Sequence, residues 1–504
     1  MPTKQEFPDT ELAGPDAGAL VESLRGLGYS LETALADLID NSITAEAGRI
    51  WISFWWDGEA SAILVEDDGN GMDEAGLKQA MRLGSQGPGV DRDARDLGRF
   101  GLGLKTASMS QCRRFTVRSS TPDSKRIATR CWDLDLIKSS REWLLTTKAS
   151  ERSEALIAQL GKSRHHGTIV LWEGLDRLVG AAQASDTGAR DRFLEHVDKV
   201  RAHLGTVFHR FLEGRNPLEI RVNDQPVVPW DPFLREEPAT QALGQEILPF
   251  DGRTITIQPY VLPHNSKINK EVHERAAGIR GWNASQGFYV YRAERLLVAG
   301  DWLGLPFQKE EHAKLARIKI DLPNSLDSEW HLDVRKARAR PPGALRPDLK
   351  RIAKATREKA TSVYRHRGKI LDRAISAANY MWHYKSKAGK TFFEINREHP
   401  LIVQLLEEPE PARSRTKRLL RLLEETVPLP TIAMLSSQSP DSAPVPFAAA
   451  SESEVETLAR NIYEALRLGG MTPVQAAERL RVLEPFPLYN SLLERIMPEL
   501  LDHE

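Results

Sequence analysis

Three glycines stand just ahead of a lysine between Asp96 and Ser108, where the sequence reads DLGRFGLGLKTAS. Glycine lets a backbone approach a ligand closely, and the N–H groups at the start of a helix can hold phosphate. Lys105 adds a point charge that suits a terminal phosphate. The same pattern also occurs in tight turns that bind nothing. The segment therefore predicts a phosphate-binding loop only in combination with other motifs.

An acid and an amide lie four residues apart on a predicted helix from Leu31 to Glu46, for which Ser30 is the expected N-cap. At that spacing Asp37 and Asn41 project from one face of the helix. A carboxylate beside an amide can position an attacking water and hold a magnesium ion. The alternative is an ordinary solvated helix face.

A second acidic motif, DDGNGM, runs from Asp67 to Met72 and follows a predicted strand from Ala62 to Val65. Its first carboxylate could accept a hydrogen bond from a ligand amino group, with the glycines leaving room for a ring. The alternative is an Asp-Gly turn. Further along, Thr168 opens a predicted strand, Ile169 to Trp172, and could be either a ligand contact or an ordinary β-branched strand residue.

Taken together and in this order, the four motifs resemble the ATP-binding domain of the GHKL superfamily, which includes gyrase B, heat-shock chaperones, histidine kinases and MutL. They span residues 30–170. The loop from Gly98 to Met109 is most similar to the form found in MORC-type ATPases, including their bacterial relatives. The resemblance implies an α/β fold, an α+β sandwich of the GHKL type, that binds ATP and Mg²⁺.

The resemblance also assigns roles to individual residues. Asp37 would act as the general base and Asn41 would ligate magnesium. The adenine would be bound by Asp67, Gly69, Gly71, Met72 and Thr168. The phosphates would be bound by Gly98, Gly101, Gly103, Lys105 and Thr106. Residues 84–96, which are rich in glycine and charge, would form a lid over the nucleotide.

Two positions depart from the family pattern. The family usually has Glu where this chain has Asp37, and Asp is one methylene shorter, so its carboxylate would sit further from the attacking water. Slow hydrolysis, or binding without turnover, is therefore an open alternative. Thr44 replaces an Asp found in many relatives, and there we expect a structural effect only.

The composition predicts an ordinary water-soluble protein of several domains. The chain has 504 residues, of which 41% are hydrophobic and 28% charged, with a net charge of −1. Cys112 and Cys131 offer neither a disulfide framework nor a metal-binding spacing, which fits a reducing compartment. The sequence has no long apolar run and no apolar signal core at its N-terminus, so we expect a cytoplasmic protein without a membrane span.

Beyond the ATP-binding motifs, the segment from Gln286 to Leu297 resembles a signature of the transducer domain of MORC- and MutL-like ATPases. That domain usually supplies a Lys to the terminal phosphate. Lys336 is the candidate here, with Arg335 as its rival. The expected organisation is an ATP-binding domain (1–212), a transducer-like α/β domain (213–344), a basic helical region (345–427), a linker (428–450) and a small helical C-terminal domain (451–504).

A predicted long helix from Leu345 to Ile375 is strongly basic. It carries ten Lys and Arg residues against three acidic ones, in a chain that is almost neutral overall. Such a surface suits a polyanion, and double-stranded DNA is the expected one. The alternative is a solvated helix whose charges pair with acidic patches elsewhere. Because no motif for base-specific recognition is present, DNA contacts should be mainly to the backbone and sensitive to salt.

These features predict a MORC-like ATPase, slow in turnover, whose ATP-dependent homodimer acts as a clamp or switch on DNA. Its bacterial relatives often belong to antiviral defence systems, which makes a partner nuclease or helicase plausible by analogy alone. Two alternatives remain open. One is a chaperone-like ATPase that acts on a protein partner, and the other is a nucleotide-sensing scaffold that barely hydrolyses ATP.

Overall fold

The computed structural model describes most of the chain. The described residues are 15–26, 28–84, 103–124, 126–162, 166–327, 329–330, 339–375, 381–387, 390–428, 447, 450–483, 485–486 and 489–502. The chain divides into two compact units, residues 1–363 and residues 364–504.

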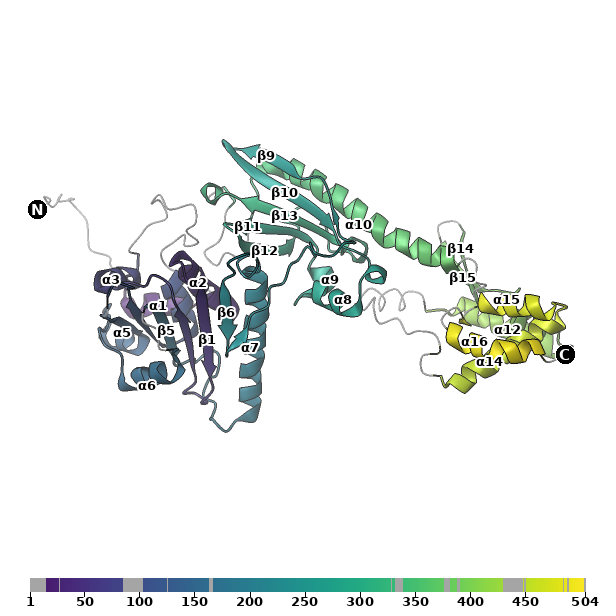
Figure 1. Ribbon diagram of the computed structural model, residues 1–504, viewed down its shortest axis with the longest axis horizontal. Coiled ribbons are helices and arrows are strands. Elements are labelled where there is room, and N and C mark those ends of the chain that lie inside the picture. The colour runs from purple at the N-terminus through teal and green to yellow at the C-terminus, as the bar shows by residue number, and fades with distance from the viewer. Residues whose placement is uncertain are drawn as a thin grey trace, which may run out of the picture. The chain divides into compact units, whose positions relative to one another are not determined.

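The first unit begins with a seven-stranded sheet in the order β4-β3-β5-β2-β1-β6-β7. Figure 1 labels its strands β5, β1 and β6. Neighbouring strands are antiparallel except β1 and β6, which run parallel. The strands are β1 (Arg49–Trp55), β2 (Ala62–Asp67), β3 (Arg114–Ser120), β4 (Ala128–Asp133), β5 (Gly167–Glu173), β6 (Glu219–Val222) and β7 (Gln225–Pro226).

Helices cover both faces of this sheet, because successive strand residues point to opposite sides. On one face, Ile63 and Val65 of β2 join the main core with residues of α1, α2, α4 and α7. On the other face, Ala62 and Leu64 pack against Leu156 of α6. The helices of this region are α1 (Ala17–Arg25), α2 (Leu31–Thr44), α3 (Glu74–Met81), α4 (Gly103–Gln111), α5 (Leu134–Ser140), α6 (Glu151–Leu160) and α7 (Thr187–Val207).

The predicted helix from Leu31 to Glu46 is α2, which ends two residues earlier than expected. Ser30 is its N-cap, and its side chain accepts a hydrogen bond from the backbone N–H of Thr33. The cap satisfies one of the N–H groups that have no partner within the helix. Leu35 and Ile39 are fully buried, so α2 is anchored in the core and presents its polar residues at fixed positions.

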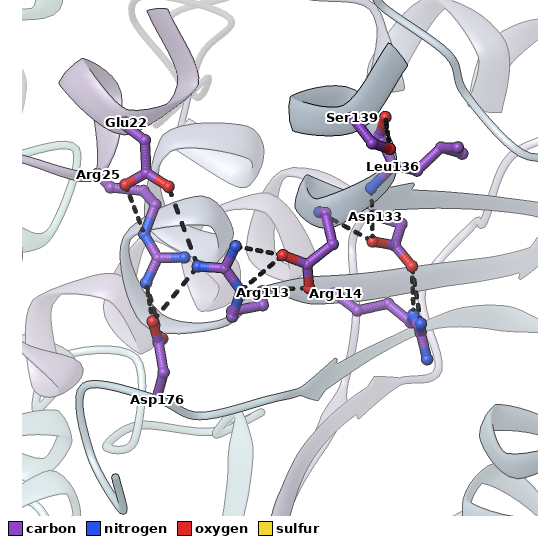
Figure 2. A network of polar contacts seen from close by, with 9 residues as sticks. Glu22, Arg25, Arg113, Arg114, Asp133, Leu136, Ser139 and Asp176 are labelled. Carbon is purple, nitrogen blue, oxygen red and sulfur yellow. Dashed lines mark hydrogen bonds and ion pairs between the residues drawn. The ribbon is translucent and has the colours of Figure 1, made fainter. Parts of the chain in front are cut away.

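A network of ion pairs ties α1 to the edge of the same domain (Figure 2). Arg25, which is 1% exposed, donates to both carboxylate oxygens of Asp176 at 2.7 Å. Arg113, at the start of β3, contacts Asp176, Glu22 and Asp135. The guanidinium of Arg113 therefore links the last turn of α1 to β3 and to the chain that follows β5.

A second mixed sheet follows in the first unit, in the order β12-β11-β13-β10-β8, with β9 also paired to β10. Its strands are β8 (Gln241–Ala242), β9 (Glu246–Phe250), β10 (Arg253–Val261), β11 (Gly287–Arg292), β12 (Arg295–Asp301) and β13 (Ala316–Leu322). Short helices α8 (Lys270–Ala277) and α9 (Gly281–Ala284) precede β11. Single 3-10 turns span Asn265–Lys267, Glu311–Ala313, Asn324–Leu326 and Gly343–Leu345.

The predicted basic helix is α10 (Arg346–Ile375), which runs along this second sheet (Figure 1). Leu349, Ile352 and Ala360 form its buried stripe. Arg351 pairs with Glu246 of β9 at 2.5 Å and so fixes the first half of the helix to the sheet.

The second unit is mainly helical. It contains a hairpin of β14 (Trp382–Lys387) and β15 (Lys390–Ile395), followed by α11 (Pro400–Glu407), α12 (Ala412–Glu425), α14 (Glu452–Leu468), α15 (Pro473–Arg481) and α16 (Asn490–Asp502). The last three helices share one apolar core, which confirms the predicted C-terminal helices. Most of the proposed linker, residues 428–450, lies outside the described residues.

The architecture is an α/β sandwich followed by further α/β and helical regions, as the sequence predicts. None of the helices in the described ranges is long and apolar enough to cross a membrane.

Candidate functional site

A row of polar residues crosses one end of the first sheet. Strand register places Ser119 of β3 opposite Thr168 of β5, and Thr168 opposite Asp67 of β2. Alternation along each strand puts all three side chains on the face that packs into the main core, the same face as Val65 and Val170. Residues from three separate stretches of sequence are therefore brought together by strand pairing alone.

Asp67 is the centre of this row and is 6% exposed. Its Oδ2 accepts a hydrogen bond from the hydroxyl of Ser42 on α2 at 2.8 Å. Its Oδ1 accepts from the backbone N–H groups of Gly69 at 3.0 Å and Thr168 at 3.2 Å. Burial raises the pKa of this carboxyl above its usual 3.8, against the lowering effect of these donors.

The backbone around Asp67 approaches its neighbours closely. Gly71 has φ of 61°, and a Cβ at this position would lie 2.0 Å from the carbonyl oxygen of Ser120. Only glycine fits such a position without a shift of the backbone. The hydroxyl of Ser119 accepts from the N–H of Met72 at 2.8 Å and lies 2.9 Å from the hydroxyl of Thr168. The turn after β2 is thus fastened to the polar row.

Helix α2 carries the acid and amide pair next to this row. Asp37 is 3% exposed, and its Oδ2 accepts a hydrogen bond from the hydroxyl of Tyr29 at 3.0 Å. Asn41, one turn later, is exposed. A Cβ on Gly103, the first residue of α4, would lie 3.7 Å from Asp37 Oδ2, so the carboxylate faces the start of α4.

Lys105 and Thr106 lie in the first turn of α4 and are both buried. The Lys105 amine donates to the carbonyl oxygen of Ala80 in the last turn of α3 at 2.8 Å. Burial lowers the pKa of this amine to about 8. The bond to Ala80 uses one of the three N–H donors of the charged amine, so the predicted phosphate contact stays a prediction.

Several predicted site residues lie outside the described residues. They are Gly98, Gly101, Lys336, its rival Arg335, and the predicted lid beyond Gly84. Their roles remain predictions.

Residues 29–168 match the family described as histidine kinase-, DNA gyrase B- and HSP90-like ATPases. This segment runs from Tyr29, just ahead of α2, to Thr168 in the polar row. Residues 29–168 form a GHKL-type ATPase domain. The sequence-based recognition of the superfamily is confirmed.

Two further comparisons add no functional detail. No curated protein matches the sequence. The N-terminal domain of a DNA repair protein is similar in structure, with a TM-score of 0.40 and 15% identity, and the match covers 70% of this chain and 99% of that one.

The residues present fit the adenine nucleotide that a GHKL domain binds. A carboxylate offers about four acceptor positions, and three protein donors reach Asp67, which leaves capacity for an amino group. The exposed amide of Asn41 offers the oxygen ligand that Mg²⁺ prefers, and the other ligands of such an ion are commonly waters and phosphates.

Sequence reasoning missed four residues that shape the site: Tyr29, Ser42, Ser119 and Arg295. Ser42 follows the Asp37–Asn41 pair directly, and its position on the buried face of α2 was a usable signal. The partnership of Ser119 with Thr168 depends on strand register, and Arg295 comes from the second sheet. No local pattern indicates either of these two contacts.

Proposed function

We propose that this protein is a MORC-like ATPase that binds Mg²⁺-ATP through residues 29–168 and hydrolyses it slowly. Asp37 takes the proton of the attacking water, Asn41 ligates magnesium, and Asp67 accepts from the adenine amino group. The Gly98–Lys105 loop holds the phosphates, with Lys336 reaching the terminal phosphate from the following domain.

The observation that supports this proposal best is that one helix serves both ends of the site. Through Ser42, α2 holds the buried carboxylate of Asp67, and five residues earlier its Asp37 faces the start of α4. Because α2 is a continuous helix anchored by buried Leu35 and Ile39, the two carboxylates keep a fixed separation. One rigid helix thus carries the proposed general base and also holds the proposed adenine contact of β2 in place.

We further propose that ATP joins two copies of the chain and that the dimer acts as a clamp on double-stranded DNA. The first half of α10 supports a DNA contact, since Lys350, Lys354 and Lys359 are exposed along it. Arg351 and Arg357 are instead used within the protein, in ion pairs with Glu246 and Glu310. The side chains of Arg365, Arg367, Lys369 and Arg373 lie outside the described residues.

The test is steady-state ATP hydrolysis by the purified chain, with and without long double-stranded DNA, using Asp37→Ala as the control. Turnover that needs Asp37 and rises with DNA is the expected result. Turnover that persists in Asp37→Ala contradicts the assignment of the base. Turnover that ignores DNA contradicts the clamp and leaves the chaperone-like alternative.

A nucleotide-sensing scaffold is the second candidate. It is favoured by the hydrogen bond from Tyr29 to Asp37, which occupies one oxygen of a carboxylate already shorter than the usual Glu. Tight ATP binding by the wild-type chain, with no phosphate release above the background rate, would identify this function.

A further inference from the structure

The hairpin of β11 and β12 contacts the ATPase domain at several points, and Asp321 of the neighbouring strand β13 also contacts it through Arg210. The Tyr291 hydroxyl lies 2.8 Å from Nε2 of the fully buried His209, just after α7. Glu294, in the hairpin turn, lies 3.2 Å from Arg210. The third contact, made by Arg295 at the start of β12, is the one that reaches α2.

Arg295 bridges two buried carboxylates of α2. Its Nε donates to Asp40 Oδ1 at 2.7 Å, and its Nη2 lies 3.9 Å from Asp37 Oδ1. The three side chains are between 1% and 5% exposed. Two buried carboxylates on one helix thus lie beside a cation that belongs to another sheet, and removing one member of a buried ion pair is destabilising.

The surroundings of Arg295 are not close-packed. It lines a cavity of about 1050 Å³ together with Glu32 and Thr33 of α2, His203 of α7, and Leu297 of β12. The described side chains leave this space open beside the ion pair, so the bond from Arg295 to Asp40 is a direct link here between the second sheet and α2.

We propose that Arg295 is a positioning residue that couples the second sheet to the general base. Through its hydrogen bond to Asp40 it holds the middle of α2, and its guanidinium places a positive charge 3.9 Å from the Asp37 carboxylate that faces α4. A displacement of the β11–β12 hairpin would withdraw the guanidinium, leave two like charges in a buried environment, and misplace the base. The inference rests on the proposed function, in which Asp37 activates water.

The experiment compares Arg295→Ala with Arg210→Ala in the full-length protein. Arg210 is a matched control, because it also forms ion pairs across this interface, with Glu294 and Asp321, but does not touch α2. Arg295→Ala should lower kcat about 10-fold or more while changing ATP affinity less than about 3-fold. Arg210→Ala should change kcat less than about 3-fold, and Arg295→Lys should recover part of the lost rate.

A second variant distinguishes a loss of coupling from a loss of the folded structure. D40N/R295Q removes both charges but keeps hydrogen-bonding groups of similar shape, so the interface can remain folded. If the double variant is folded, its kcat should remain lower than that of the wild type, because the guanidinium beside Asp37 is gone. Full turnover in this variant or in Arg295→Ala overturns the inference and leaves the proposed function intact. A wild-type protein without turnover overturns the proposed function and the inference together.

Discussion

Ser42 on helix α2 donates its hydroxyl to Oδ2 of Asp67 at the end of strand β2, at a distance of 2.8 Å. The bond joins the helix that carries the candidate base to the strand end that carries the candidate adenine contact. Burial of Asp67 costs stability, since its pKa is raised despite three donors. A carboxylate retained in such a place suits a ligand contact better than a purely structural role.

Asp67→Asn should weaken ATP binding without lowering the stability of the protein. The amide keeps an acceptor for the N–H groups of Gly69 and Thr168, and its nitrogen can donate to Ser42, while no charge has to be buried. We expect an unchanged or higher melting temperature without nucleotide, and ATP binding weaker by about 1–3 kcal/mol in isothermal calorimetry.

The stability of the wild-type protein should depend on pH through Asp67, because the pKa of this carboxyl is raised. The folded protein holds this proton more tightly than the unfolded chain, so its contribution to stability is present below 3.8 and is lost as pH rises through the folded value. Asp67→Asn should lack that decline. Equal ATP affinity in both proteins would exclude the adenine role of Asp67.

Lys105→Met should flatten the pH dependence of ATP binding. A phosphate contact requires the charged amine, whose pKa is lowered to about 8, so wild-type affinity should fall as pH rises beyond that value. Calorimetric titrations from about pH 7 to about pH 10 would detect the change. Identical profiles in the two proteins would leave Lys105 as a partner of Ala80 only.

The same lowered pKa of Lys105 predicts how the stability of the nucleotide-free protein changes with pH. Burying the charged Lys105 amine costs free energy below about pH 8, and the cost is relieved as pH rises from there toward the ordinary value of 10.5. The free energy of unfolding of the wild type should therefore rise relative to Lys105→Met across this window. Urea denaturation at both ends of the window measures it.

Asp176→Ala should destabilise the protein by about 2 kcal/mol, because it removes the carboxylate that pairs with the buried Arg25 (Figure 2). Asp176 is itself partly exposed, which keeps the loss below that of a fully buried pair. Asp135→Ala is the matched control, since this exposed acid pairs with Arg113 and should cost less than about 1 kcal/mol. Equal losses in chemical denaturation would contradict a special contribution of the buried pair of Arg25 and Asp176, which joins α1 to the chain after β5.

Charge reversal on α10 should weaken DNA binding. K350E/K354E changes two exposed lysines without disturbing the buried stripe, and the slope of log affinity against log salt should become shallower by about two. K138E/K199E, an equal change on exposed lysines of α5 and α7, should leave that slope nearly unaltered. Fluorescence anisotropy with double-stranded DNA, recorded at several salt concentrations, makes the comparison. A similar loss in both variants would indicate a general charge effect and no specific role for α10.

Local sequence patterns predicted the elements of the site well. The N-cap Ser30, helix α2 and the strands ending at Asp67 and beginning near Thr168 follow from capping, periodicity and turn chemistry, all of which act over a few residues.

Relationships across long stretches of chain could not be predicted in this way. Arg295 and Asp40 are separated by 255 positions, and nothing in either segment indicates that the two side chains meet. The amine of Lys105 illustrates the same limit at shorter range. Its motif predicts a phosphate contact, but its neighbour in the structure is the carbonyl of Ala80, which the end of α3 brings close.

The polar row of Ser119, Thr168 and Asp67 has a consequence for how the domain tolerates insertions. All three positions lie in the interiors or ends of paired strands, where a shift by one residue turns every side chain to the opposite face. A one-residue insertion that shifted all of β5 against its neighbours would carry Thr168 off the row and at the same time turn the apolar Trp172 away from the core. Loss of the nucleotide site and loss of the fold are then the same event, so length changes in this domain should be confined to its loops.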